Sequence, residues 1–343
     1  MTAALFSETG QTSVPDFARL VRIEFQRFFA RRFIWIAGAL ALLGLFVAVG
    51  ASYAKHSRIS ADDLAAATRQ RDQVIAEISQ QVQDCSKGLA VEQAQQQCGQ
   101  VPTAQDFPPD QFLRSRPFEP RQVSDYALAI GVAVALIGFA VGATFIGAEW
   151  STKNLVSWLF WEPRRLRLMA AKLLALLSVA LAVAVLAQLA WFAAAHLLLH
   201  YRGLPVSSLG AQSKHFWQHV RDSQLRAVLL VLPTSLLGFG MANLIRNTAA
   251  AFGVGFVYFA VVESLIRTIN PDWQPYLLTT NVGAWVSNGG LTVFGKAVFD
   301  QRQGYVTARP IHVSNLHGGI ALLIYSGVVL LVSVIVFRRR DIS

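Results

Sequence analysis

The sequence predicts an all-α polytopic membrane protein that crosses the bilayer six times, and three observations lead to that fold class. The chain is 54% hydrophobic and only 15% charged, and its mean hydropathy is +0.42, a balance that soluble domains do not have. Six apolar runs reach the roughly 20 residues that a helix needs to cross a hydrocarbon core. Backbone groups in lipid must be hydrogen-bonded within their own segment, so each run is expected to be a helix.

The expected spans cover, in chain order, residues 33 to 54, 126 to 147, 170 to 199, 225 to 244, 249 to 268 and 316 to 337. Small residues recur inside them at helical spacing, as at Gly138 and Gly142, and at Gly238 close to Ala242. This spacing is typical of helices whose backbones approach closely, and we interpret it as packing.

Basic residues gather in three places, and in a chain with six spans all three lie on the same side of the membrane. These places are residues 1 to 32, residues 148 to 169 and the tail at 338 to 343, and their cations include Arg19, Arg22, Arg27, Arg31, Arg32, Lys153, Arg164, Arg165, Arg167, Arg338, Arg339 and Arg340. By the positive-inside rule both termini are cytoplasmic.

The formal net charge of +10 would also suit a nucleic-acid partner. The cations stand at the ends of apolar runs, however, which indicates a lipid interface and no nucleic acid. We therefore expect a multi-pass protein of a bacterial cell membrane.

The N-terminal segment, residues 1 to 32, is expected to contain an amphipathic helix. Ser13 and Asp16 flank Pro15 in a capping arrangement, and one face of the helix then carries Phe17, Val21, Phe25, Phe28 and Phe29. Such a helix lies in the headgroup layer, although a plain extension of the first span stays open. The first apolar run is too long, and its basic leader too extended, for a cleaved signal peptide.

Residues 55 to 125 are expected to form an extracytoplasmic domain. Its first half has apolar residues at helical spacing, whereas several prolines beyond Gly99 enforce irregular backbone. Cys85 and Cys98, the only cysteines of the chain, both lie in this segment. An oxidising exterior favours joining them, so we expect a disulfide. Two cysteines are too few for a zinc cluster, and no metal site is expected.

Two further external loops are expected, over residues 200 to 224 and 269 to 315. In the second, residues 276 to 299 are apolar but interrupted by glycines, so they do not make a span. Residues 290 to 297 come close to a phosphate-loop pattern, but Ala297 stands where a hydroxyl must hold magnesium. With no other candidate, the chain is expected to bind no cofactor and to have no ATPase site of its own.

The most specific motif lies in the cytoplasmic segment 148 to 169. An acidic residue closes the second span, a short polar stretch and a basic turn follow, and a lysine opens the third span. The residues of this pattern are Glu149, Thr152, Lys153, Asn154, Leu155, Arg165 and Lys172, and Glu162, Pro163 and Arg164 lie in the same segment. This pattern resembles the permease subunits of type-2 ATP-binding-cassette (ABC) exporters. Ser151 stands where that family usually has glycine, and the aromatic insert at 158 to 161 also departs from it.

The resemblance implies a coupling helix in segment 148 to 169 that contacts a separate ATP-binding subunit. It implies two copies of that subunit, which hold ATP and magnesium, and a second permease copy in a homo- or heterodimer. It also implies a pair of short re-entrant helices within residues 276 to 299. The exported substrate is expected to be amphipathic or hydrophobic, such as a drug, a peptide or a lipid. The expected coupling residues are Glu149, Thr152, Lys153, Asn154, Glu162, Pro163, Arg164 and Arg165.

Polar residues inside spans are costly and often functional. Gln188, His196, Asn243 and Glu263 are therefore candidates for a substrate path, with interhelical hydrogen bonding as the alternative. Two other functional classes stay open. One is a membrane scaffold or sensor that acts through its external domain, and the other is a membrane enzyme that uses His196 or Glu263. The enzyme has little support, because no acidic residue lies between His196 and His200 as a zinc protease requires.

Overall fold

The structure is a computed structural model that describes residues 17–87, 98, 100–104, 106–113, 116–152, 164–300 and 305–339. It is mostly helical, and the described residues contain six helical segments long and apolar enough to cross a membrane. These segments run over Arg32–Lys55, Pro120–Ser151, Arg165–Arg202, Gln212–Ile245, Thr248–Ile269 and Asn315–Arg339. Every one contains an expected span, so the prediction of six spans is confirmed in number, length and composition.

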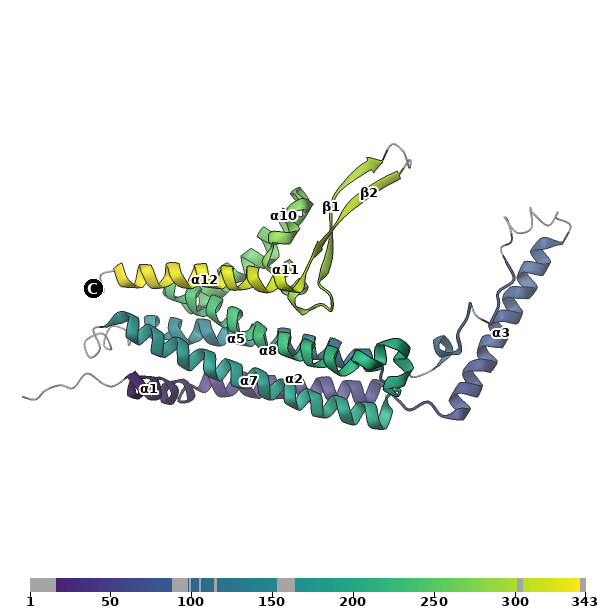
Figure 1. Cartoon of the computed structure of the whole chain (residues 1–343), viewed down its shortest axis with the longest axis horizontal. Helices are drawn as coiled ribbons and strands as arrows, with labels where there is room; N and C mark the ends of the chain where they lie inside the picture. Colours follow the sequence, from purple (N-terminus) through teal and green to yellow (C-terminus); the bar gives the residue numbers. More distant parts are fainter. Residues whose placement is uncertain are drawn as a thin grey trace, which may run out of the picture. The chain divides into compact units, whose positions relative to one another are not determined.

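In Figure 1 these segments are α2 (Arg32–Lys55), α5 (Pro120–Ser151), α7 (Arg165–Arg202), α8 (Phe216–Ile245), α9 (Thr248–Val257) continued by η3 (Tyr258–Val262) and α10 (Glu263–Ile269), and α12 (Asn315–Arg339). The 3-10 helix η2 (Val206–His215) leads directly into α8. The expected external loop 200 to 224 is therefore largely helical.

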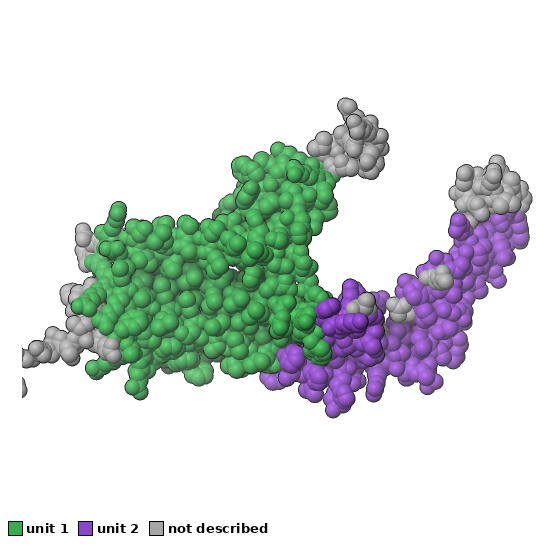
Figure 2. All heavy atoms as spheres, in the orientation of Figure 1, with its two compact units in different colours: residues 1–45, 124–191, 217–343 green, residues 46–123, 192–216 purple. Residues whose placement is uncertain are grey.

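The chain divides into two compact units, coloured separately in Figure 2. Unit 1 comprises residues 1–45, 124–191 and 217–343, and unit 2 comprises residues 46–123 and 192–216.

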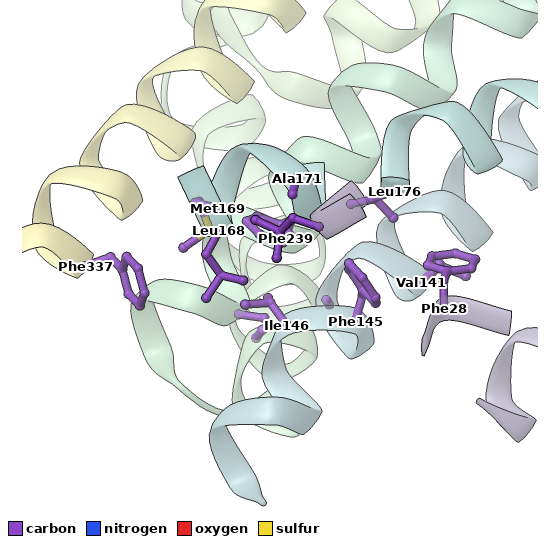
Figure 3. Packing of buried hydrophobic residues seen from close by; sticks show 14 of the residues in the cluster. Phe28, Val141, Phe145, Ile146, Leu168, Met169, Ala171, Leu176, Phe239 and Phe337 are labelled. Carbon is purple, nitrogen blue, oxygen red and sulfur yellow. The ribbon is translucent and has the colours of Figure 1, made fainter. Parts of the chain in front are cut away.

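The main core of unit 1 joins helices α1 (Phe17–Phe29), α2, α5, α7, α8, α9 and α12. Phe28 of α1, Phe145 of α5, Leu168 of α7, Phe239 of α8 and Phe337 of α12 are all buried in one cluster. Figure 3 shows these side chains converging from their separate helices. Because so many helices share one core, a displacement of any of them disturbs the packing of the others.

Helices α5 and α8 approach closely at glycines. A Cβ atom on Gly142 would collide with the carbonyl oxygen of Ser235, and one on Gly238 would collide with that of Phe139. The interpretation of these small residues as packing positions is therefore confirmed.

Helix α1 is amphipathic, and the face that it buries coincides only in part with the expected one, since Phe28 is buried and Phe17 and Val21 pack against the core. Leu20, Glu24 and Phe28 are buried, whereas Phe29 is 46% exposed. The reason is that positions 20, 24 and 28 form one stripe at four-residue spacing, and this stripe packs into the core of unit 1.

The segment after α10 corrects the expectation of two re-entrant helices. It contains η4 (Pro271–Tyr276), one short helix α11 (Leu278–Val286), and an antiparallel hairpin of β1 (Leu291–Asp300) and β2 (Tyr305–Val313). The register pairs Leu291 with Val313 and Asp300 with Tyr305, with an irregularity between Phe294 and Ala297. The fold is thus mostly but not entirely helical, and the stretch that resembles a phosphate loop lies in β1.

The hairpin follows from the residues themselves. Gly289 and Gly290, in the turn between α11 and β1, have φ values of 83° and 93°, a conformation that glycine adopts without strain. Residues 291–294 and 305–307 are rich in aromatic and β-branched side chains, which favour strands.

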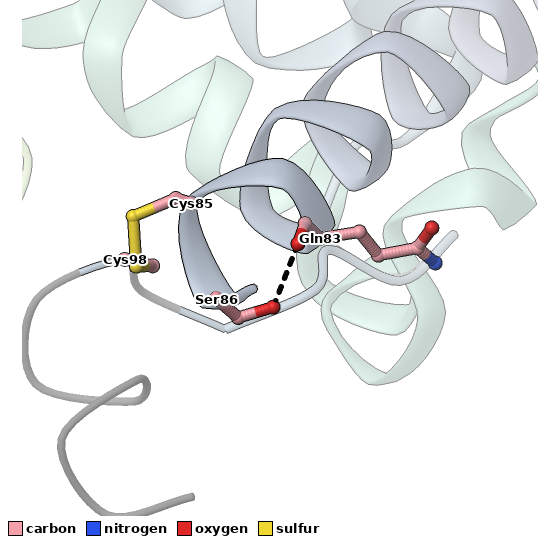
Figure 4. Close-up of a disulfide and its surroundings, with 4 residues drawn as sticks. All are labelled: Gln83, Cys85, Ser86 and Cys98. Carbon is pink, nitrogen blue, oxygen red and sulfur yellow. Dashed lines mark hydrogen bonds between the residues drawn. A yellow bond between two sulfur atoms is a disulfide. The ribbon is translucent and has the colours of Figure 1, made fainter. Parts of the chain in front are cut away.

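Unit 2 contains α3 (Ala61–Ser86), the short helix η1 (Pro109–Phe112) and largely irregular backbone between residues 100 and 119. The disulfide between Cys85 and Cys98 closes the end of α3, with a Cα–Cα distance of 5.7 Å. Figure 4 shows this bond beside Ser86, whose hydroxyl donates to the carbonyl oxygen of Gln83. The helix, the irregular segment and the disulfide predicted for this domain are all confirmed.

The start of α3 is a capping box that predicts a pH dependence. The Ser60 hydroxyl accepts from the Asp63 amide at 3.1 Å, and the Asp63 carboxylate accepts from the Ser60 amide at 3.0 Å. Hydrogen bonds from the Ser60 hydroxyl and amide lower the pKa of Asp63 below its ordinary value. Because the pKa of Asp63 is lower in the folded helix than in the unfolded chain, ionised Asp63 stabilises the helix at pH values above its unfolded pKa. This stabilisation is lost as the pH falls through the folded pKa.

We therefore expect amide hydrogen exchange in the first turn of α3, corrected for intrinsic rates, to accelerate severalfold between pH 6 and pH 3. Ser60→Ala is expected to produce the same acceleration already at pH 6, because it removes the cap. Equal protection in the variant and the parent at pH 6 would contradict this role.

Candidate functional site: a buried charge network

Several helix ends of unit 1 meet where the chain is most basic. Arg165, the first residue of α7, donates to the carbonyl oxygen of Phe337 in the last turn of α12 at 3.1 Å. The Trp150 ring, at the end of α5, lies 6.0 Å from the Phe337 ring. Arg31, which precedes α2, bonds to Glu149 near the end of α5. We call this end of unit 1 the basic end.

A buried ion cluster lies at the centre of the basic end. Lys172 of α7 is fully buried, and its Nζ lies 2.8 Å from Glu24 Oε2 of α1 and 2.8 Å from Glu149 Oε2 of α5. Arg31 Nη2 lies 2.6 Å from Glu149 Oε1, and Arg27 Nη1 lies 3.6 Å from Glu24 Oε1. The cluster therefore joins α1, α5, α7 and the start of α2.

The surroundings hold these charges in place. Arg31 also donates to the carbonyl oxygen of Phe145 at 2.8 Å, and its Cζ lies 4.9 Å from the centre of the Phe145 ring. Lys172 Nζ lies 5.2 Å from the same ring, an arrangement that favours cations. Burial lowers the pKa of Arg31, and the nearby carboxylate of Glu149 acts in the opposite direction.

Burying such charges is costly, and their mutual attraction compensates only while every partner is present. Each of the two carboxylates faces two cations: Glu24 pairs with Lys172 and Arg27, and Glu149 pairs with Lys172 and Arg31. A cluster of this kind fixes the relative positions of the helices that it joins.

Glu24 is the functional residue that the sequence interpretation missed. It is the only acidic residue between positions 17 and 32, and it lies four residues from both Leu20 and Phe28. An acidic residue within an apolar stripe, in a segment otherwise rich in arginine, indicates a buried ion pair. A helix expected to lie in the headgroup layer has no buried partner for such a residue, so the ion pair was not predicted.

A second polar group ties α5, α8 and α12 together at the basic end. Trp150 Nε1 donates to Asn243 Oδ1 at 2.9 Å, and Asn243 Nδ2 donates to Ser333 Oγ at 2.7 Å. Arg246, in the turn between α8 and α9, places its Cζ 4.6 Å from the Trp150 ring. These bonds extend the rigid region beyond the ion cluster.

The expected coupling residues divide between described and undescribed parts of the chain. Glu149 belongs to the ion cluster, and the Thr152 hydroxyl donates to the carbonyl oxygen of Ala148 at 2.9 Å. Arg164 directly precedes α7, and Arg165 bonds to the end of α12. Lys153, Asn154, Glu162 and Pro163 lie outside the described residues. The chain thus leaves α5 and rejoins α7 at the basic end.

A comparison with known protein families finds no family model that matches the chain, and a comparison with curated proteins finds no match.

The structure does not gather the four substrate-path candidates into one site. Gln188 Nε2 donates to the carbonyl oxygen of Ala127 at 2.9 Å, and Asn243 bonds to Trp150 and Ser333. His196 is exposed and belongs to unit 2. For Gln188 and Asn243 these bonds join different helices, which is the structural alternative named for them.

Glu263, the fourth candidate, is buried at the start of α10. Its Oε1 accepts from the Thr279 amide at 3.0 Å, its Oε2 accepts from the Thr279 hydroxyl, and Arg267 Nη2 lies 3.5 Å from Oε2. A carboxylate at the first turn of α11 is well placed for the positive end of that helix. Glu263 therefore holds α10 against α11.

Among the described residues no group of three histidine, cysteine or acidic side chains is placed to hold a metal ion. At the basic end, ion pairs and hydrogen bonds hold several helices together, and charged residues lie near both Thr152 and Arg164, where the described chain leaves α5 and enters α7. Such an arrangement is suited to passing on a mechanical displacement.

Proposed function

We propose that this chain is the permease subunit of an ATP-driven exporter of the type-2 ABC kind, and that segment 148 to 169 couples it to a separate ATP-binding subunit. The observation that carries the proposal is the ion cluster of Lys172, Glu149 and Glu24 beside that segment. The sequence motif supplies the expected contact, and the cluster supplies a means of passing a force on.

The physical argument concerns the two ends of the segment. Glu149 lies at its start and Lys172 lies three residues after its end, and Lys172 Nζ lies 2.8 Å from Glu149 Oε2. A force applied to the segment therefore reaches α5 and α7 together. Because Lys172 also bonds to Glu24, α1 moves with them. Packed cores pass displacement between discrete arrangements and do not deform continuously.

In the proposed cycle two permease copies flank a path, and two partner subunits bind ATP and magnesium. Closure of the partner subunits displaces the coupling segments, and the permease copies rearrange to release substrate on the other side. The apolar composition of the spans suits an amphipathic or hydrophobic substrate. The orientation follows from the basic clusters and places the basic end in the cytoplasm.

Purification of the full chain from its native membrane in mild detergent is expected to recover an ATP-binding subunit. Lys153→Glu with Arg164→Glu is expected to lower its recovery about tenfold, the effect of removing about 1.4 kcal/mol of binding free energy, because both substitutions reverse the charge of residues in the proposed coupling segment. The yield of bound subunit and its ATP hydrolysis rate are the measurements.

Arg221→Glu provides the matched control, because Arg221 is an exposed arginine whose side chain is 74% accessible and lies near the start of α8, away from the basic end. It is expected to leave the recovery unchanged. Recovery of the chain alone, or of a partner that binds only residues 55 to 125, would contradict the transporter and favour a scaffold or sensor.

A further inference from the structure

A groove in unit 2 combines an apolar interior with cationic residues at one end. Its walls come from α2, from residues 57 and 58 just after it, and from α7, and its volume is ≈ 880 Å³. Phe46 and Leu197 line its apolar part, and Tyr53, Tyr201, Arg58 and Arg202 line its polar part. A site of this volume lies within the range of about 300–1,000 Å³ that is typical of small-molecule sites.

The polar part lies at the level where both helices end. Tyr53 is in the last turn of α2, and Arg202 is the last residue of α7. Phe46 lies seven residues before Tyr53, which is about 10 Å deeper along the helix axis. Tyrosine and arginine at helix ends mark the interface between hydrocarbon and headgroups, so the groove runs from that interface into the hydrocarbon.

Arg202 is held in a fixed orientation. Its Cζ lies 3.7 Å from the centre of the Tyr53 ring, and its Nη1 donates to the carbonyl oxygen of His56 at 2.7 Å. His56 is itself buried, and its Nδ1 lies 2.7 Å from the carbonyl oxygen of Ser52. The guanidinium has five N–H donors, so donors remain for a ligand in the groove.

Two cations, Arg58 and Arg202, border the groove. Within the described parts of the chain, no carboxylate forms an ion pair with Arg58 or Arg202. These arginines also lie at the opposite ends of α2 and α7 from the basic end, where the positive-inside rule does not call for them. A bound anion accounts for both facts.

We propose that this groove binds one anionic phospholipid, with its phosphate between Arg58 and Arg202 and an acyl chain against Phe46 and Leu197. Arginine suits phosphate because its planar fork offers parallel N–H donors to two oxygens. The apolar part of the groove sets a phospholipid apart from free phosphate, which has nothing to place there. The proposal rests on the membrane location of the chain and not on the exporter.

Two glycines of α2 provide a matched pair of variants. A Cβ on Gly50 or on Gly44 would meet no atom within 4 Å, so a larger side chain fits the fold at either position. Gly50 lines the groove, whereas Gly44 does not. Gly50→Phe therefore obstructs the proposed lipid site, and Gly44→Phe makes the same change elsewhere on the helix.

The test is native mass spectrometry of the full chain in detergent, titrated with phosphatidylglycerol, with phosphatidylcholine and with diacylglycerol of the same acyl chains. We expect the parent to bind one phosphatidylglycerol more tightly than phosphatidylcholine, and to bind no diacylglycerol at this site. Arg58→Gln and Arg202→Gln are each expected to weaken phosphatidylglycerol about tenfold, the loss of about one charge-assisted contact. Gly50→Phe is expected to abolish the bound lipid, and Gly44→Phe to retain it.

Arg202→Gln also removes the bond to His56, so a loss seen in that variant and not in Arg58→Gln overturns the proposal. The proposal is overturned if diacylglycerol binds as tightly as phosphatidylglycerol, or if Gly50→Phe and Gly44→Phe retain the lipid equally. Displacement of the lipid by millimolar inorganic phosphate would also overturn it, since the acyl chain would then contribute nothing.

Discussion

Replacing Lys172 with methionine is expected to lower the free energy of unfolding by about 3–5 kcal/mol, the cost of breaking a buried ion pair by removing one partner. The substitution keeps the length of the side chain but leaves Glu24 without its closest cation, because Lys172 Nζ at 2.8 Å is nearer than Arg27 at 3.6 Å. Glu149 retains Arg31. Thermal unfolding of the purified chain in detergent, followed by tryptophan fluorescence, measures the change.

Lys87→Met is the matched control, because Lys87 forms an ion pair with Asp84 in which the side chains are 77% and 69% exposed. Such a pair contributes about 0–1 kcal/mol. Adding Glu24→Gln to Lys172→Met is expected to recover part of the stability, since it removes the unpaired charge. Equal stability of Lys172→Met and Lys87→Met would show that the cluster does not hold the helices.

Gly238→Val is expected to destabilise the chain by about 3 kcal/mol, at the upper end of the usual cost of overpacking. The new side chain would collide with the carbonyl oxygen of Phe139, and backbone atoms cannot turn aside as a side chain can. Helices α5 and α8 must separate to admit it. The same unfolding measurement reports the loss.

Gly253→Val in α9 introduces the same side chain where a Cβ meets no atom within 4 Å. Any effect of valine on the helix itself is common to both variants, so their difference isolates the collision. If Gly238→Val unfolds at the same temperature as Gly253→Val, the claim that α5 and α8 pack closely at Gly238 is contradicted.

The membrane-crossing helices were predictable because their signal is long and local. A run of apolar residues long enough to cross lipid must form a helix. The bounds of α2 and α12 therefore differ from the predicted ones by at most two residues at either end. The disulfide was predictable for a similar reason, since Cys85 and Cys98 had no other partner in the chain.

The hairpin and the ion cluster were not predicted, for different reasons. The hairpin is a local pairing, but β2 begins at Tyr305, outside the apolar stretch 276 to 299, so the pattern within that stretch does not reveal the strand that pairs with β1. Lys172 and Glu24 are separated by 148 positions. The local spacing of apolar residues carries no information on such a pair. Only Glu24, an acidic residue within the apolar stripe of α1, indicated that a buried ion pair exists.

The most direct test of the coupling proposal is photo-cross-linking from position 164 in native membranes. A photoreactive amino acid in place of Arg164 is predicted to form an adduct with an ATP-binding subunit, and one in place of Ser208 in η2 is predicted to form none. An adduct from position 208 but not from 164, or labelling of position 164 by a reagent that cannot cross the membrane, would contradict the proposal.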